Sequence, residues 1–236
     1  MRMLLNRLQG HLENIYEVQS GYRVTDFLIC DPALARDLDE SEGARELPEK
    51  LLIRTQGDKE VNVGLYLDPV LIDRLEKDDP TEMLHGRNLH DFWLALEGIS
   101  HFLYFTWNAG YERPVSLLEM ELQGEVDKYI LATFLFYSQQ RGAVPAGLHQ
   151  HLFHELAYDT RLNMAELRRY RRANYLAARF CYLVETLFLR SRSHAAMFNT
   201  LRRFYRLTHH HKIKSIEHFG KSAAMPAGCR QLNFSH

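Results

Sequence analysis

Cysteine is scarce in this chain, and its three copies, Cys30, Cys181 and Cys229, lie far apart in the sequence. None of them belongs to a CxxC pair, so the sequence predicts neither a cysteine-based zinc cage nor a disulfide framework. An odd number of widely spaced cysteines is typical of a protein from a reducing compartment.

Long apolar runs are also missing. The N-terminal segment interrupts its leucines with Asn6, Arg7 and Gln9, so it lacks the apolar core of a secretory signal peptide. The longest lipid-like run, residues 129–137, is far shorter than the ~20 apolar residues that a membrane-spanning helix requires. We therefore expect a cytoplasmic protein that does not cross a membrane.

The motifs of several functional classes are absent from the sequence. Neither GxGxxG nor the P-loop pattern occurs, which disfavours a dinucleotide or P-loop nucleotide site. There is no GxSxG elbow, and no cysteine lies in a recognisable catalytic motif. RRM, KH and zinc-finger signatures are missing as well. Function must therefore be inferred from the pattern of charged and polar residues.

The composition is that of an ordinary globular protein, with 46% hydrophobic and 25% charged residues in 236. Hydrophobic periodicity predicts a mainly α-helical α+β protein. Residues 1–80 are expected to form an N-terminal helix and a small antiparallel β segment. Residues 81–220 are expected to form a bundle of about five helices, and residues 221–236 a flexible tail.

The expected elements follow from the apolar spacing and from turn signals. A short helix is predicted over 3–18, strands over 22–30, 50–55 and 60–68, and an exposed acidic loop over 37–49. The bundle helices are predicted over 89–109, 115–139, 146–158, 163–190 and 195–218, where glycine, proline or asparagine separates them.

Charge is sorted between the two halves of the chain. Residues 1–130 carry 25 acidic and 13 basic side chains, whereas residues 131–236 carry 5 acidic and 16 basic ones. The net charge of −1 conceals this asymmetry. It predicts either neutralisation inside the molecule or a basic surface for an anionic partner.

The helix predicted over 115–139 is apolar on every side and yet carries two polar stripes. One stripe holds Glu119, Gln123 and Asp127, and the opposite one holds Glu121, Glu125 and Lys128. We expect the second stripe to be partly buried, with Gly124 beside it allowing close approach of another group. Buried carboxylates are costly unless they are paired, metal-bound or protonated.

Arginine is one candidate partner for these carboxylates. On the helix predicted over 163–190, a stripe of Arg168, Arg172, Arg179 and Arg190 runs beside Tyr175 and could pair with carboxylates bidentately. This pairing would be structural. The predicted polar pocket then comprises Glu97, His101, Glu121, Glu125, Lys128, Arg172, Tyr175 and Arg179.

A divalent metal is the other candidate partner. Glu97 and His101 are four residues apart on one helical face, and Glu121 and Glu125 would complete an oxygen- and nitrogen-rich set, with His154 as a further candidate. The repeated Glu-x-x-His signature of di-iron bundles is absent. An ordinary amphipathic helix accounts for the same spacing, and both interpretations stay open.

The last helices are strongly basic. The predicted anion-binding residues are Arg168, Arg172, Arg203, Arg206, His210 and Lys214. Our first hypothesis is an intracellular binding or regulatory protein whose basic helices engage nucleic acid or an acidic protein. The alternative is a metal-dependent hydrolase or oxidase that uses the carboxylate and histidine site. A third is a homo-oligomer in which acidic and basic halves of different copies meet.

Overall fold

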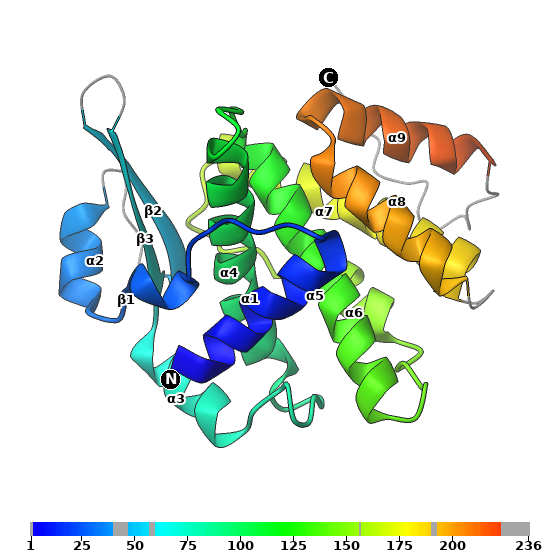
Figure 1. The fold of residues 1–236 in the computed structure, drawn as a ribbon, viewed down its shortest axis with the longest axis horizontal. Coiled ribbons are helices and arrows are strands. Elements are labelled where there is room, and N and C mark those ends of the chain that lie inside the picture. Colours follow the sequence, from blue (N-terminus) through cyan, green and yellow to red (C-terminus); the bar gives the residue numbers. More distant parts are fainter. Residues whose placement is uncertain (1, 40–46, 57–59, 156, 190–192, 223–236) are drawn as a thin grey trace.

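The computed structural model describes residues 2–39, 47–56, 60–155, 157–189 and 193–222 (Figure 1). Most of these residues are helical, and a small three-stranded sheet lies at one end of the molecule. None of the helices in these segments is both long and apolar enough to cross a bilayer. Residues 40–46 of the predicted loop, Arg190 and residues 223–236 of the predicted tail lie outside the described residues.

The first third of the chain interleaves helices with strands. Its elements are α1 (Arg2–Tyr16), the 3-10 turn η1 (Val24–Asp26), β1 (Leu28–Ile29), α2 (Pro32–Leu38), β2 (Glu49–Gln56), β3 (Glu60–Leu67) and α3 (Pro69–Lys77). Asp31 and Asp68 cap α2 and α3 by accepting backbone N–H groups, and a proline follows each aspartate at the first helical position. These two helices were not predicted, so the expected separate β segment is only partly correct.

The sheet has the strand order β1-β3-β2. β2 and β3 form the predicted antiparallel hairpin, with Leu51 opposite Leu65. β1 pairs with β3 in the parallel direction over two residues, so the expectations of an all-antiparallel sheet and of a long strand over 22–30 are wrong. The 3-10 turn η1 occupies the middle of that predicted strand, and α2 separates β1 from the hairpin, which leaves β1 free to run parallel.

The remainder of the chain is helical. Its elements are α4 (Leu89–Ala109), α5 (Leu117–Gln139), α6 (Leu148–His154), α7 (Met164–Val184), the π-helical turn η2 (Glu185–Leu189), α8 (His194–Arg206) and α9 (His209–Ser222). The helix expected over 195–218 is two helices, because the backbone is extended at Leu207 (ψ 148°). The described residues hold nine α-helices, of which six, α4 to α9, lie in the region where a bundle of about five was expected, so the expected count is not matched.

Helix α5 is the central element, and it packs on both α4 and α7 (Figure 1). Capping boxes at Ser116 and Asn163 begin α5 and α7. One hydrophobic core joins Leu8 of α1, Phe102 of α4 and Val126 of α5, on both sides of the predicted domain boundary at residue 80. The division into two domains stays a prediction.

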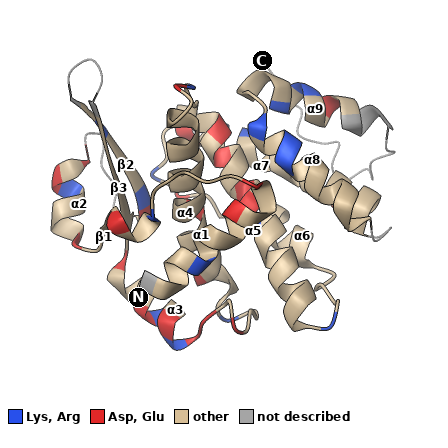
Figure 2. Cartoon of the chain, viewed as in Figure 1, with Lys and Arg blue, Asp and Glu red and all other residues tan. Residues whose placement is uncertain are grey.

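Both polar stripes of α5 are buried. Gln123 and Asp127 on one side are 0% and 1% exposed, while Glu121 and Lys128 on the other are 8% and 6% exposed. In Figure 2 acidic colour lies on α2, on α3, at the C-terminal end of α1 and on α5, and α8 and α9 carry mainly basic side chains. The partners of the buried charged side chains of α5 must therefore account for their burial.

Candidate metal centre

The second polar stripe of α5 meets α4 in a buried cluster of charged side chains. Glu97 and His101 lie one turn apart on α4, and Glu121 and Lys128 face them from α5. His101 Nε2 lies 3.8 Å from Glu121 Oε2. The spacing of four residues on α4 and the packing of α4 on α5 bring these predicted site residues together.

Lys128 neutralises two of the carboxylates. Its Nζ donates to Glu97 Oε2 at 2.9 Å and to Glu125 Oε1 at 2.7 Å. Burial alone would lower the pKa of this lysine, but the carboxylates of Glu125 and Glu97 outweigh that effect and raise the pKa above its ordinary value. Lys128 is therefore charged and firmly held between α4 and α5.

Glu97, His101 and Glu121 form a triad whose ligand atoms all lie within 4.8 Å of one another. Two atoms bound to one zinc ion at about 2.1 Å are at most about 4.2 Å apart, so small side-chain rotations suffice to close the triad on an ion. Glu125, the fourth predicted ligand, is not among the residues whose ligand atoms converge, and its Oε1 accepts a hydrogen bond from Lys128. His154 lies elsewhere, with its ring against His149.

Two glycines allow the close packing around this cluster. A Cβ on Gly124 of α5 would lie 3.1 Å from His101 Nε2, so only glycine lets the imidazole approach α5 this closely. A Cβ on Gly98 of α4 would lie 2.8 Å from Leu65 Cδ1 and 3.0 Å from Glu49 Oε2. Gly98 thus admits the sheet, and Glu49 with it, to the edge of the cluster.

Burial and like charges shift the acid–base behaviour of the cluster. Burial, followed by the neighbouring carboxylate of Glu97, raises the pKa of Glu121 to about 8. The same two causes, together with Glu121, raise the pKa of Glu49 well above its usual range. Burial lowers the pKa of His101, so its imidazole is neutral near pH 7 and a nitrogen lone pair is available to a metal.

Several buried acceptors in the cluster make no hydrogen bond within the described part of the chain. They are Glu49 Oε2, His101 Nε2 and Glu125 Oε2. Buried polar atoms in native proteins are almost always satisfied. In charge terms, four glutamates, at positions 49, 97, 121 and 125, face two cations, Lys128 and Arg169. Fully ionised, the cluster would lack two positive charges. In the metal-free protein the raised pKa values of Glu49 and Glu121 favour their protonated forms, so protons supply these charges, and a divalent ion would replace the protons.

A cavity of about 460 Å³ opens onto this cluster. Glu49, Glu97, Glu121, Glu125 and Lys128 line it together with aromatic side chains that include Trp93, Tyr158 and Tyr170. The cavity falls within the roughly 300–1,000 Å³ of small-molecule sites. His101 stands behind the carboxylates, so an ion held by the triad would be reached from the cavity through Glu97 and Glu121.

The arginine nearest to the carboxylates is not one of the predicted stripe. Arg169 Nε lies 3.5 Å from Glu121 Oε1. Arg179 donates to Tyr175 at 2.7 Å on α7, and Arg168 and Arg172 are exposed. Arg172, Tyr175 and Arg179 are absent from the residues that line the cavity, so the structure does not bring them to the triad.

Glu49 and Arg169 are the members of the cluster that sequence reasoning missed. Glu49 is two residues before Leu51 on β2, so both side chains lie on the face of the strand that packs on α4. Arg169 is four residues before Ala173 on the buried face of α7, which continues through Leu176 and Phe180. Period-2 and period-3.6 patterns were therefore the signals available.

The first polar stripe of α5 forms a closed network instead. Asp127 accepts hydrogen bonds from Ser100 at 2.6 Å and from Tyr16. Gln123 donates to Asp127 at 2.7 Å and accepts from the buried ammonium of Lys212. Burial raises the pKa of Asp127 to about 6 and lowers the pKa of Lys212 to about 7. These groups satisfy one another inside the core, and we assign them to the stability of the fold.

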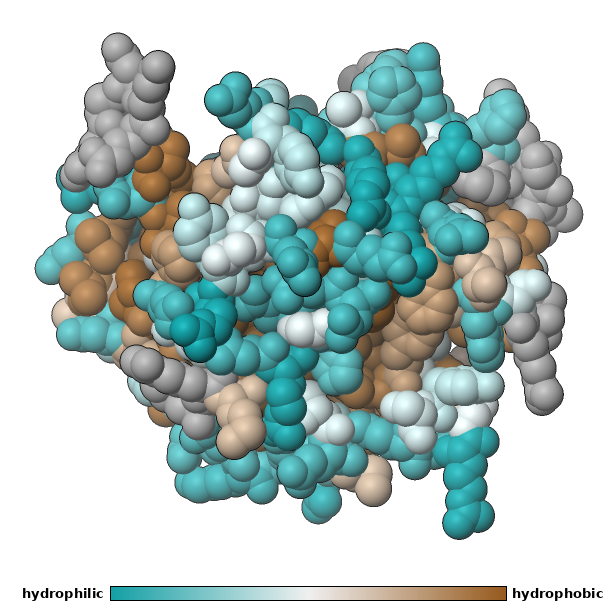
Figure 3. Space-filling model, viewed as in Figure 1, coloured by the Kyte–Doolittle hydropathy of each residue, from teal (hydrophilic) through white to brown (hydrophobic). Residues whose placement is uncertain are grey.

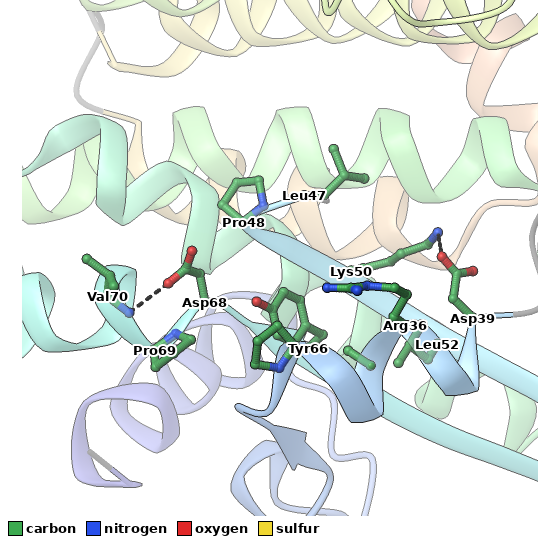
Figure 4. Close-up of a pocket in the computed structure, with 12 residues that line it drawn as sticks. Arg36, Asp39, Leu47, Pro48, Lys50, Leu52, Tyr66, Asp68, Pro69 and Val70 are labelled. Atoms are coloured by element: carbon green, nitrogen blue, oxygen red, sulfur yellow. Dashed lines mark hydrogen bonds and ion pairs between the residues drawn. The ribbon is translucent and has the colours of Figure 1, made fainter. Parts of the chain in front are cut away.

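A second cavity, of about 560 Å³, lies between α2, the sheet and the start of α3 (Figure 4). Its lining is largely apolar, and Figure 3 shows apolar side chains gathered on this side of the molecule, over α2 and the hairpin. Lys50 pairs with Asp39 there, and Asp68 accepts the backbone N–H of Val70. These contacts are an ion pair and a helix cap, and neither indicates a catalytic or metal-binding role for this cavity.

The predicted anion-binding residues are dispersed over three helices. Arg206 donates to the backbone oxygens of Tyr16 and Glu17 at the end of α1, which ties α8 to α1. Arg203 and Lys214 line a cavity between α8 and α9. The remaining three, Arg168, Arg172 and His210, are exposed.

No protein-family model matches this chain, and no curated protein or solved structure is significantly similar to it. Function must therefore be inferred from the chemistry of the sites. Among them, the triad of Glu97, His101 and Glu121 combines metal-binding side chains, unsatisfied buried acceptors and an adjoining cavity.

Proposed function

We propose that this protein is a divalent-metal-dependent hydrolase whose metal is held by Glu97, His101 and Glu121. The observation that carries the proposal is the set of buried acceptors without hydrogen-bond partners beside the triad, at Glu49, His101 and Glu125. A bare ion-pair network accounts for Lys128 and its two glutamates, but it leaves these atoms unsatisfied. A divalent ion held by the triad would give His101 Nε2 a partner and would take the place of the protons that burial favours on Glu121 and Glu49.

The donor set suits a borderline transition ion such as Zn²⁺ or Mn²⁺. Neutral imidazole nitrogen favours zinc, and carboxylate oxygens are accepted by zinc and manganese alike. Three protein ligands leave further coordination positions for water and substrate, as in catalytic zinc sites. The cavity beside Glu97 and Glu121 supplies the space that these positions need.

Hydrolysis follows from what surrounds the triad. A bound divalent ion lowers the pKa of its water toward neutrality. Glu125 lines the cavity and its buried Oε2 makes no hydrogen bond within the described residues, so this carboxylate would accept the proton. Lys128 and Arg169 are the cations near the triad that would stabilise negative charge developing on the substrate.

Metal titration tests the proposal. Chelator-treated protein is titrated calorimetrically with Zn²⁺ and with Mn²⁺, and we expect one ion per chain. Glu121→Gln should weaken binding by at least about tenfold, because it removes a ligand and a negative charge. Asp127→Asn is the matched control, since it removes a buried carboxylate from the opposite face of α5 and should leave the affinity unchanged.

Either of two results would refute the site. Wild-type protein that binds neither ion shows that the triad is not a metal centre. Equal losses in Glu121→Gln and Asp127→Asn show that any binding depends on the overall fold and not on the triad. A bound metal that activates no cleavage of chromogenic carboxylate and phosphate esters would leave the metal centre in place and remove the hydrolase assignment.

The other functional hypotheses stay predictions. Engagement of nucleic acid or of an acidic protein by the C-terminal helices loses one of its predicted contacts, because Arg206 is bonded to α1. Self-association of the acidic and basic halves is expected to show as dissociation at high salt in light scattering.

A further inference from the structure

A cavity of about 470 Å³ lies between α8 and α9, away from the metal centre. Helix α9 packs on α7 and α8 packs on α1, so the two helices rest on different supports and diverge after the turn at residues 207–208 (Figure 1). Each presents one face to the cavity. The lining residues are Thr200, Arg203, Phe204 and Leu207 from α8 and its end, His211, Lys214, Ser215 and His218 from α9, and Phe180 from α7.

The lining contains cations and hydroxyl groups and no acidic side chain from the described residues. Arg203 and Lys214 project from facing helices, and His211 and His218 lie one turn before and after Lys214 on the same face of α9. Glu217, the acidic residue of α9, is not part of the lining. Positive charge therefore converges on the cavity from both sides.

These two cations are not used to hold the fold together. Arg202 and Arg206 of the same helix bond backbone oxygens at the end of α1. Arg203 and Lys214, in contrast, are exposed and make no ion pair with a described residue. Arg202 and Arg206 thus hold α8 on α1, whereas Arg203 and Lys214 face solvent and are available to a ligand.

The floor of the cavity indicates which kind of anion fits. Phe180 and Phe204 are stacked with their ring centroids 3.8 Å apart, and they are 1% and 2% exposed. Because these rings are covered, they close the floor but offer no platform on which a base could stack. Recognition must come from charge and hydrogen bonds around a compact, multiply charged group.

We propose that this cavity binds a small polyphosphorylated ligand through Arg203 and Lys214. The guanidinium of Arg203 matches the oxygens of a phosphate group bidentately, and Lys214 supplies a second cation from the opposite wall. The volume exceeds the need of a single phosphate and suits a pyrophosphate or a larger polyphosphate. The site is independent of the metal centre.

Calorimetric titration with inorganic pyrophosphate tests this site. The full chain is first treated with chelator and dialysed, because pyrophosphate also binds divalent ions. At low salt we expect Arg203→Gln and Lys214→Gln each to weaken binding by about tenfold, and the double variant by more. Arg87→Gln is the matched control, since Arg87 is an exposed arginine in the turn before α4, outside the cavity, and its loss should change the affinity less than about twofold.

A short single-stranded oligonucleotide is the competing probe. Absence of pyrophosphate binding to the folded wild type, verified by circular dichroism, would overturn the proposal. So would an equal loss in Arg87→Gln and Arg203→Gln, because binding would then follow net charge. Tighter binding of the oligonucleotide than of pyrophosphate, with the same sensitivity to Arg203→Gln, would assign the cavity to a nucleic-acid backbone instead.

Discussion

Replacing Gly124 by alanine distinguishes the effect of a substitution on metal affinity from its effect on the stability of α5. The new Cβ would lie 3.1 Å from His101 Nε2 and 3.8 Å from Glu97 Cγ. A contact of 3.1 Å is tighter than nearly all real Cβ contacts, so the imidazole must move by a few tenths of an ångström. The substitution thus acts on the nitrogen that is proposed to bind the ion.

The two expected effects have opposite signs. Alanine in the interior of a helix is favoured over glycine by about 1 kcal/mol, which stabilises α5 in the metal-free protein. Displacement of the imidazole beyond the ~0.2 Å tolerance of a metal–ligand distance should weaken metal binding by about tenfold or more. Without metal, the stability of the variant should differ from that of the wild type by the helix gain minus the strain of the new contact, and added metal should stabilise the variant less than it stabilises the wild type.

The assay combines urea unfolding of chelator-treated protein with calorimetric titration of Zn²⁺. Gly10→Ala is the matched control, because Gly10 lies inside α1 and a Cβ there meets nothing within 4 Å. It should show the gain in helix stability and an unchanged metal affinity. If Gly124→Ala binds Zn²⁺ as tightly as Gly10→Ala does, His101 is not a ligand and the proposed triad is wrong.

Three further substitutions test the two buried polar networks of α5 and the packing of α4 on the sheet. Burial lowers the pKa of Lys212 from 10.5 to about 7, so between these pH values the unfolded chain binds more protons than the folded protein does. The free energy of unfolding should therefore rise with pH over this range, by at most ~5 kcal/mol. In urea unfolding measured from neutral to alkaline pH, Lys212→Met should flatten this rise. Lys128→Met leaves two carboxylates without their cation and should lower the free energy of unfolding of metal-free protein by about 3–5 kcal/mol at neutral pH. A loss below about 1 kcal/mol in urea unfolding would show that the cluster is solvated. Gly98→Ala forces a contact of 2.8 Å on Leu65 and should lower the unfolding free energy by about 1–3 kcal/mol, so an unchanged or raised midpoint in thermal unfolding contradicts the close approach of α4 to the sheet.

The elements of the metal centre were predictable because their signals are local. Glu97 and His101 are four residues apart inside a strongly apolar helix, and α4 has the predicted bounds. The carboxylates of α5 stood out because an apolar helix with charges on two sides must bury some of them. Three of the four predicted ligands meet in the structure.

Other features depend on contacts between distant residues. The break between α8 and α9 at Leu207 involves neither glycine nor proline, so local propensity continues the helix through it. The parallel pairing of β1 with β3 depends on how the chain returns after α2. The helices α2 and α3, in contrast, begin with Asp-Pro, a capping signal that the sequence does contain.

The rotation of α7 decides which arginine reaches the carboxylates. Arg168, Arg172 and Arg179 share a stripe, but the buried face of the helix passes through Ala173 and Leu176 and includes Arg169. A helical wheel of α7 that considers only the charged residues therefore predicts the wrong face to pack against the carboxylates. The apolar residues orient a helix, because burial of their surface dominates its packing energy.

The most direct test of the metal centre is anomalous scattering from a crystal of the protein soaked with Zn²⁺. If the triad binds zinc, one peak should lie beside α4 and α5, about 2.0–2.2 Å from His101 Nε2 and from one oxygen each of Glu97 and Glu121. Density without a peak there, with the triad side chains arranged as they are in the metal-free protein, would contradict this prediction.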